Sequence, residues 1–392
     1  MFSKAPRGGR SGAVAMHVVY LITRGDAVGG ATIHVRDLAR VLIRSGNRAT
    51  VLAGGAGEAY QEFQRHGIPC EVIPALRRSI HPLRDAAALV RIVAALRRLR
   101  PDLVSAHTAK AGLLGRVAAK IAGVPCLFTA HGWSIGDRVS RAGGLIFTLA
   151  ERLAAPLAAR IVNVCQAEQD LAARRGIGPM DRFEVIHNGV HDVPPDLRAH
   201  PETEPPHLIT VARFEPPKDQ ALQLEALSRL RDIPWSLEFI GAGPLLEQAK
   251  RRAWRLGLEN RVLFSGSSTN VAERLSQAQL FVLSSRSEGF PRGILEAMRA
   301  GLPVVATDVG GVAEAVIPET GLLVPRGDAG ALAGALRRLI ADPDLRARMG
   351  RAARARYQRH FTFSMTCAKT FDLYQRLLGA AIEQRVPAGE QV

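Results

Sequence analysis

Residues 17–54 read HVVYLITRGDAVGGATIHVRDLARVLIRSGNRATVLAG, and this stretch decides the fold class. Its first part, HVVYLI (17–22), is a short apolar run with β-branched residues, which is typical of a buried parallel strand. After a glycine-containing loop, TIHVRDLARVLIRSG (32–46) has apolar residues at helical spacing and ends at Gly46. ATVLAG (49–54) has the character of a second strand. The stretch therefore predicts a strand–loop–helix–strand unit of a parallel sheet.

The same alternation continues along the chain and is interrupted once. The interruption, DVPPDLRAHPETEPPH (192–207), contains five prolines and no apolar period, which indicates a linker. Strands are expected at 102–107, 126–131, 160–165, 183–189, 207–212, 236–241, 261–266, 280–285, 303–307 and 321–325. Helices are expected near 110–122, 219–231, 244–256, 293–300, 328–341, 344–360 and 364–384. The pattern predicts an α/β protein with two doubly wound, Rossmann-like domains and an interdomain cleft at the carboxyl ends of the strands.

The expected domain organisation follows from the linker and from the two chain ends. We expect a basic N-terminal segment (1–15), an N-terminal domain (16–191), the linker (192–207), a C-terminal domain (208–361) and a C-terminal helix within 362–392 that packs back on the N-terminal domain.

The first fifteen residues lack the apolar core of a secretory signal. The four cysteines are too scattered for a zinc knuckle or a disulfide framework. We therefore expect a protein of the reducing cytoplasm.

The positive charge is concentrated in the first half of the chain. The net charge is +16, and residues 1–190 hold 26 Lys and Arg against 13 Asp and Glu, whereas residues 191–392 hold 26 against 23. The segment 75–100 is basic and amphipathic, and it contains Arg77, Arg78, Arg84, Arg91, Arg97, Arg98 and Arg100. Such an excess points to an anionic partner, either lipid headgroups or nucleic acid. The sequence has no helix-turn-helix or zinc pattern and no basic strand studded with aromatics, so we favour a peripheral protein on the inner face of the plasma membrane over a nucleic-acid-binding protein.

The segment SSRSEGFPRGILEAMRAGLPVVATDVGG (284–311) carries two glutamates eight residues apart. Glu288 is expected on a loop after a strand. The amides of a helix that opens at Gly293 would form an anion site, and Glu296 just inside it could accept hydrogen bonds from ribose hydroxyls. This combination suits a nucleotide diphosphate sugar. The simpler alternative is that Glu288 is an ordinary loop residue and Glu296 an exposed helical residue, and that neither binds a ligand.

A second segment, VARFEPPKDQ (211–220), carries two cations. Arg213 is expected at the end of a strand and Lys218 at the start of the next helix. Two cations at this position could neutralise a diphosphate leaving group without a metal, although solvated surface cations are the alternative. No Asp-x-Asp motif follows a strand, so we expect no cofactor and no required divalent metal.

These residues, in this order, resemble the retaining glycosyltransferases of family four, which have the GT-B fold. The resemblance covers residues 16–380. It also rests on Gly29-Gly30, HTAKAGLLGRVAAKIAGVP (107–125), TAHGW (129–133), HNGV (187–190) and Gly241–Pro244. The HTAKAG and AHGW segments are similar to enzymes that assemble exopolysaccharide, capsule and O-antigen.

The resemblance implies roles for particular residues. Arg213 and Lys218 would hold the donor phosphates, Glu296 the ribose, Glu288 the hydroxyls of the transferred sugar, and His131 the sugar as well. Further donor contacts are implied at Gly29, Gly30, Gly243, Phe290, Gly293, Ile294 and Leu295, and acceptor contacts are expected at Lys110 and Trp133. The block departs from many relatives in reading Gly-Phe-Pro-Arg after Glu288, which puts the shape of the sugar pocket in doubt.

The implied activity is transfer of a hexose or N-acetylhexosamine, with retention, from a UDP- or GDP-linked donor to a lipid-linked acceptor in bacterial surface polysaccharide synthesis. A nucleotide-sugar epimerase of the same fold is the alternative enzyme. A dinucleotide-dependent dehydrogenase is disfavoured because the first loop lacks Gly-x-Gly-x-x-Gly. The donor sugar, its base and the oligomeric state stay open at this point.

Overall fold

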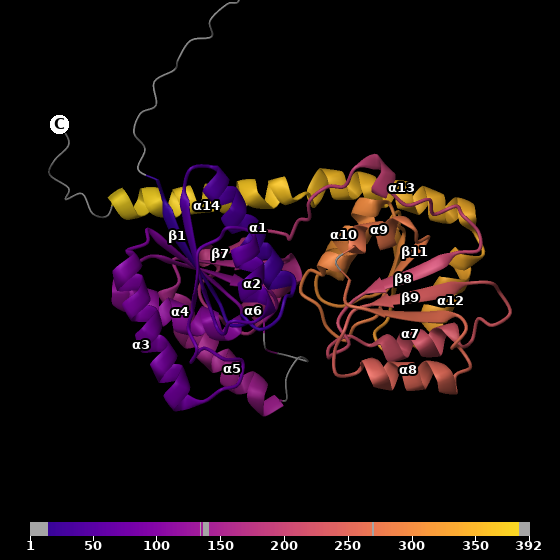
Figure 1. Ribbon diagram of the computed structural model, residues 1–392, viewed down its shortest axis with the longest axis horizontal. Helices are drawn as coiled ribbons and strands as arrows, with labels where there is room; N and C mark the ends of the chain where they lie inside the picture. The colour runs from indigo at the N-terminus through magenta and orange to yellow at the C-terminus, as the bar shows by residue number, and fades with distance from the viewer. Residues whose placement is uncertain (1–14, 134, 136–140, 269, 384–392) are drawn as a thin grey trace, which may run out of the picture. The chain divides into compact units, whose positions relative to one another are not determined.

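The computed structural model describes residues 15–133, 135, 141–268 and 270–383 (Figure 1). Residues 1–14 of the expected basic N-terminal segment and residues 384–392 lie outside this part of the chain. The described chain as far as Phe128, with Leu157–Ala159 and the residues from Leu377 onward, forms one compact unit. Residues Thr129–Pro156 and Arg160–Arg376 form the other. The division falls inside a strand, so one of the two sheets contributes to both units.

The first sheet has seven strands. They are β1 (His17–Ile22), β2 (Arg48–Ala53), β3 (Cys70–Val72), β4 (Leu103–His107), β5 (Cys126–Ala130), β6 (Arg160–Asn163) and β7 (Phe183–Val185). The helices that alternate with them are α1 (Gly30–Arg44), α2 (Glu58–Arg65), α3 (Pro82–Leu99), α4 (Ala109–Ala122), α5 (Arg141–Ala154) and α6 (Gln166–Arg174). The strand order is β3-β2-β1-β4-β5-β6-β7, and β1 pairs in parallel with both β2 and β4.

The middle of this sheet is apolar because its strands are covered by helices on both faces. All six residues of β1 are buried. Val19 and Leu21 pack in one cluster with residues of α3 and α4 such as Ile92 and Ala118. Gly112 on α4 is required by close packing, since a Cβ there would lie 2.2 Å from the ring of Phe128.

The second sheet has six strands. They are β8 (His207–Val211), β9 (Ser236–Ile240), β10 (Val262–Gly266), β11 (Leu280–Leu283), β12 (Val304–Thr307) and β13 (Gly321–Val324). The helices in this part of the chain are α7 (Gln220–Leu227), α8 (Leu246–Arg255), α9 (Val271–Ser276), α10 (Arg292–Ala300), α11 (Val312–Ala315), α12 (Ala329–Ile340), α13 (Pro343–His360) and α14 (Phe363–Glu383), and the last of these continues from the second unit into the first. Short 3₁₀ turns occur at Ala155–Leu157, Met180–Arg182 and Pro195–Leu197. The order β10-β9-β8-β11-β12-β13 repeats the winding of the first sheet.

Consecutive residues of the second sheet point to opposite faces. Leu208 belongs to the cluster formed with α7, α8 and α12, whereas Ile209 belongs to the cluster formed with α10. On β11, Val282 and Phe281 divide in the same way. Figure 1 shows α7 and α8 on one side of this sheet and α9 and α10 on the other. The predicted α/β class with two doubly wound, parallel sheets is therefore confirmed.

The proline-rich segment 192–207 is held in place by a buried arginine of α13. The guanidinium of Arg346, which is fully buried, donates to the carbonyl oxygens of Pro201 at 2.6 Å and Thr203 at 3.2 Å. It also donates to the carbonyl oxygens of Leu339 and Ile340 at 2.7 and 2.8 Å. These hydrogen bonds attach the segment, which lies within the second unit, to α13.

Several expected boundaries were wrong. The strand expected at 183–189 ends at Val185, because the chain then leaves the sheet and Val190 forms a bridge with Thr362. The helices α2, α5, α6, α9 and α11 and the short strand β3 were not predicted.

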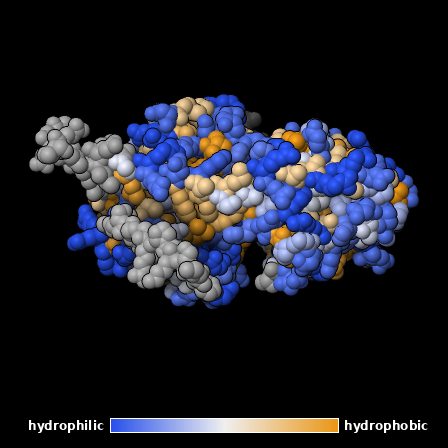
Figure 2. All heavy atoms as spheres, turned by 90° about the horizontal axis from the view of Figure 1, so that it is seen from above, coloured by the Kyte–Doolittle hydropathy of each residue, from blue (hydrophilic) through white to orange (hydrophobic). Residues whose placement is uncertain are grey.

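Hydrophilic side chains cover most of the face drawn in Figure 2, with hydrophobic residues in smaller patches between them. Among the described residues, no helix combines the length and the hydropathy needed to cross a bilayer.

Candidate active site

The predicted phosphate and sugar ligands follow the two central strands of the second sheet. β8 and β11 are neighbours, but the chain continues from β8 toward β9 on one side and from β11 toward β12 on the other. Such a reversal of winding leaves a crevice at the carboxyl ends of the two strands, where ligands of open α/β sheets bind. Arg213 and Lys218 follow β8, and Glu288 follows β11. The topology thus brings together groups that are 70 residues or more apart in sequence.

Lys218 and Glu288 form an ion pair at this point. The ammonium group of Lys218 contacts Oε1 of Glu288, and Oγ of Ser285 donates to the same oxygen at 2.5 Å. A β-bridge between Lys218 and Ser285 ties the two loops together. The side chain of Glu288 is only 10% exposed. The pair therefore holds a cation and a carboxylate in fixed places at the crevice.

Arg213 adds a second, more accessible cation. Its guanidinium pairs with Glu215 at 2.7 Å but keeps 53% of its side-chain surface exposed. The amide of Gln220 donates to the Arg213 carbonyl at 3.0 Å and fixes the loop. The helix α7 begins at Gln220 with Asp219 as its cap, so Lys218 lies before the helix and not at its start as expected. The helix begins after Asp219 because the Asp219 carboxylate accepts a hydrogen bond from the Leu222 backbone amide at 3.2 Å and caps the first turn.

The N-terminus of α10 supplies backbone amides beside these cations. Pro291 caps the helix, so α10 starts at Arg292 and Gly293 is its second residue. A Cβ at Gly293 would lie 3.1 Å from the Val211 carbonyl oxygen, so the glycine lets α10 approach β8 closely. The side chains of Ile294 and Leu295 are fully buried in the core. Any donor contact of these two residues must therefore come from the backbone, where first-turn amides favour anions.

Arg292 is a site residue that the sequence analysis did not assign. Its guanidinium donates to the Gly189 carbonyl at 3.0 Å and lies 3.9 Å from the Glu296 carboxylate. Its Nε is buried and has no partner among the described residues. The signal for Arg292 in the sequence was the Gly-Phe-Pro-Arg motif after Glu288, which differs from the pattern of many relatives. Arg292 faces the carboxylate expected to bind ribose and thereby limits how that carboxylate can turn.

His131 lies just after β5 and is influenced by the same arginine. Burial lowers the pKa of its imidazole to about 4, and the positive charge of Arg292 acts in the same direction. The ring is therefore neutral near pH 7 and can both donate and accept a hydrogen bond. A Cβ on Gly289 would lie 2.8 Å from the His131 carbonyl oxygen. The glycine after Glu288 is thus required by the close approach of the His131 backbone.

Two family models match the chain. The model for glycosyl transferases group 1 matches residues 195–356, and the model for glycosyltransferase family 4 matches residues 28–192. The chain belongs to the family 4 glycosyltransferases. Both the predicted family and the predicted enzyme class are confirmed.

Individual relatives agree with this assignment. The glycosyltransferase is 28% identical over 321 residues to UDP-Gal:alpha-D-GlcNAc-diphosphoundecaprenol alpha-1,3-galactosyltransferase of Escherichia coli, covering 77% of this chain and 82% of that one. It is 29% identical over 358 residues to 2-deoxystreptamine N-acetyl-D-glucosaminyltransferase of Streptomyces fradiae, covering 81% and 84%. The crystal structure of Anabaena Alr3699/HepE in complex with UDP-glucose is similar at 25% identity, with a TM-score of 0.79 over 92% of this chain and all of that one.

The other residues predicted to bind the donor are three glycines, at positions 29, 30 and 243, and Phe290. Gly29 caps α1 and Gly30 begins it, and a Cβ on Gly29 would meet open space. Gly243 has φ of 153°, and a Cβ there would lie 2.4 Å from the Phe214 carbonyl oxygen. Phe290 is buried, with its ring centroid 4.7 Å from that of His187. Phe290 therefore supports the loop from the core.

The two predicted acceptor residues already have partners in the glycosyltransferase. The buried indole of Trp133 donates to Asn163 at 2.9 Å, and the Trp133 amide donates to Glu168 at 2.7 Å. The ammonium of Lys110 pairs with Asp85 at 2.7 Å, joining the starts of α3 and α4. These contacts give both side chains a structural role.

A cavity of about 340 Å³ lies beside the loop that carries the two cations. It is lined by Lys218 together with residues such as Phe214, Leu245 and Arg286, but not by Arg213, Glu288 or Glu296. Because the two carboxylates are absent from its lining, this cavity lacks the groups expected to bind ribose and sugar.

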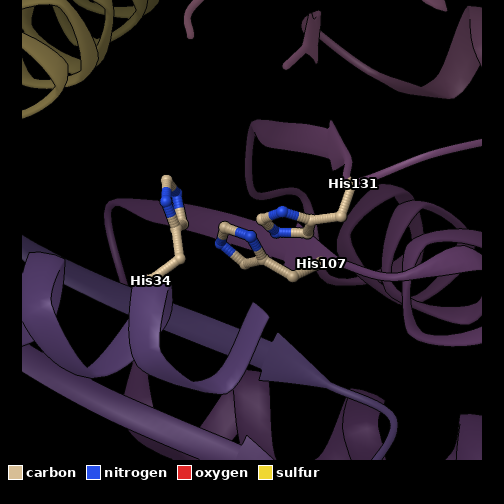
Figure 3. A group of neighbouring side chains, drawn as sticks. All are labelled: His34, His107 and His131. Carbon is tan, nitrogen blue, oxygen red and sulfur yellow. The ribbon is translucent and has the colours of Figure 1, made fainter. Parts of the chain in front are cut away.

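Figure 3 shows three neighbouring histidines, which come from α1, the end of β4 and the residue after β5. One nitrogen of each of His34, His107 and His131 lies within 4.8 Å of the others. Three imidazoles are a ligand set that Zn²⁺ accepts. The Nε2 of His107 also lies 3.0 Å from the hydroxyl of Ser105, which already orients that ring.

Proposed function

We propose that this glycosyltransferase transfers a hexose or N-acetylhexosamine from a UDP- or GDP-linked donor, with retention of anomeric configuration, to a lipid-linked acceptor in bacterial surface polysaccharide synthesis. The observation that carries the proposal is the pairing of Lys218 with Glu288 at the switch point of the second sheet, beside Arg213 and the start of α10. Cations and amides suit a diphosphate, and the carboxylates suit hydroxyl groups.

The cations would act mainly on the leaving group. As the bond from the anomeric carbon to the phosphate oxygen breaks, negative charge develops on the diphosphate. Lys218, Arg213 and the amides at the start of α10 stabilise that charge, because they are already oriented before the reaction. Donor binding would draw the Lys218 ammonium toward the phosphates, and Glu288 would then be free to accept hydrogen bonds from the sugar.

Retention follows if the acceptor attacks from the face that the diphosphate leaves. The acceptor oxygen forms the new bond to the anomeric carbon, and its proton passes to an oxygen of the departing phosphate. The neutral imidazole of His131 would hydrogen-bond a sugar hydroxyl without adding charge to an oxocarbenium-like centre. The protein contributes position and electrostatic stabilisation in this scheme, and no protein nucleophile is needed.

A membrane acceptor would explain the basic surface around α3. A cavity of about 360 Å³ is lined by Arg77, Arg84 and Arg91 with Pro74, Ala75 and Ala87, and none of these described lining residues is acidic. Arg84 and Arg91 are seven residues apart on α3 and so lie on the same side of the helix, and Arg77 precedes it in the chain. This arrangement suits anionic headgroups at the inner face of the plasma membrane. The E. coli relative, by its name, acts on a diphosphoundecaprenol-linked sugar.

The test is a panel of UDP- and GDP-linked sugars, with release of nucleoside diphosphate measured in the absence of acceptor. Slow hydrolysis of one donor is expected, and NMR of the first-formed sugar would give the anomeric configuration. Conversion of the donor into its epimer without nucleotide release would instead identify an epimerase. Absence of turnover and of binding for every donor would contradict the proposal.

A further inference from the structure

Helix α5 carries its large apolar side chains on the outside. Leu145, Ile146, Leu149 and Leu153 are 73, 65, 56 and 71% exposed. The side chains of Thr148 and Glu151 on the same helix are buried instead. A surface helix of a soluble protein normally has the opposite arrangement.

The exposed residues of α5 form one continuous face. At about 100° per residue, Leu145, Leu149 and Leu153 follow one another along the helix, and Ile146 extends their stripe sideways. Glu151 falls on the opposite side of the helix and Thr148 flanks the stripe, and both side chains are buried. Four large aliphatic side chains gathered on one exposed face are typical of a surface that binds a partner.

Arginines border this apolar face. Arg152 lies on the exposed side of α5, and its Nε donates to the Arg175 carbonyl at 2.8 Å. Arg174 and Arg175 are exposed at the end of α6. Arg182 donates to the Pro156 carbonyl at 2.7 Å, just past the end of α5. An anionic lipid surface complements this charge, whereas a second copy of the chain would bring arginines toward arginines.

We propose that α5 lies in the interface of an anionic bilayer. Leu145, Ile146, Leu149 and Leu153 would enter the acyl region, and Arg152, Arg174 and Arg175 would face the lipid phosphates. This contact differs from the electrostatic contact proposed for the α3 surface. Insertion of apolar side chains persists at high salt, whereas electrostatic attraction is screened. It does not depend on the proposed sugar transfer, because vesicle binding is measured without donor or acceptor.

The experiment is cosedimentation of the full chain with phosphatidylcholine vesicles that contain phosphatidylglycerol, at low and at high salt. The double variant Leu149→Gln/Leu153→Gln is expected to bind at least about tenfold more weakly at both salt concentrations. The matched control is Leu263→Gln, which alters a leucine that is 53% exposed on β10 and should bind like the wild type. The variant Arg174→Gln/Arg175→Gln should lose affinity at low salt only.

Donor hydrolysis in solution and thermal unfolding would show that the leucine variant is folded. Wild-type vesicle binding by the leucine double variant would overturn the proposal. The proposal would also fail if the wild type were a dimer that the leucine substitutions dissociated, with vesicle binding unchanged. Loss of vesicle binding with donor hydrolysis intact supports the membrane contact, and absence of hydrolysis in the wild type would count only against the proposed function.

Discussion

Replacing Lys218 with methionine removes one of the side-chain cations at the crevice and keeps most of the side-chain volume. The loss of one preorganised donor to developing charge costs about 10²–10³ in kcat, or about 2.7–4 kcal/mol. Lys218 forms an ion pair with Glu288, whose side chain is 10% exposed and accepts a hydrogen bond from the Ser285 hydroxyl at 2.5 Å. Because Lys218 is already held at the crevice and needs only to turn from Glu288 to the phosphates, we expect kcat/KM to fall by about 10²–10³.

The assay is release of nucleoside diphosphate from the donor identified in the panel, with thermal unfolding recorded in parallel. Leaving Glu288 without its cation should also lower the unfolding free energy by about 1–3 kcal/mol. The matched control is Lys250→Met, because Lys250 is 45% exposed and pairs with Glu247 at 2.8 Å on the surface. That variant should keep wild-type turnover. A folded Lys218→Met enzyme whose kcat/KM stays within about threefold of the wild type would refute the reasoning, given the size of the expected effect.

Three further predictions concern stability, pH and metal. Arg346→Met should lower the unfolding free energy by about 3 kcal/mol or more in denaturant titrations, because several buried carbonyls lose their donor. Arg348→Met, at an exposed site of α13, should have little effect. Equal losses of unfolding free energy in the two variants would contradict this prediction. The pKa of His131 is about 4 in the folded chain against an ordinary value of 6.5, so its contribution to stability should be lost as the pH falls from 6.5 toward 4. His131→Gln should flatten the stability curve in that window, and an unchanged curve would argue against burial of a neutral ring. Turnover should survive a chelator, and activity that is abolished by the chelator and restored by Zn²⁺ or Mg²⁺ would point to the three histidines or to the diphosphate as a metal site.

The alternation of elements could be predicted because the central strands, such as β1 and β11, are buried on both faces, whereas most helices are buried on one. Leu208 and Ile209 pack on opposite sides of the sheet, so the whole run around them is apolar in the sequence. The helix α5 was not predicted, although Leu145, Leu149 and Leu153 recur at helical spacing; that this apolar face points outward could not be inferred from the pattern. The early end of β7 depends on the distant partner Thr362, which no local pattern indicates.

The candidate site was predictable as a set of residue types but not as a set of contacts. The order of Arg213, Lys218, Glu288 and Glu296 indicated a diphosphate and a sugar. The pairing of Lys218 with Glu288 arises only because β8 and β11 are neighbours in the sheet. The role of Arg292 was missed because its partner Gly189 is 103 residues away.

The most direct test of the account is a structure of the chain with the nucleoside diphosphate of its donor. The account predicts that the pyrophosphate contacts the Arg213 guanidinium, the Lys218 ammonium and the amides at the start of α10, with the ribose hydroxyls on Glu296. A pyrophosphate bound away from the carboxyl ends of β8 and β11, with Lys218 still paired to Glu288, would contradict it.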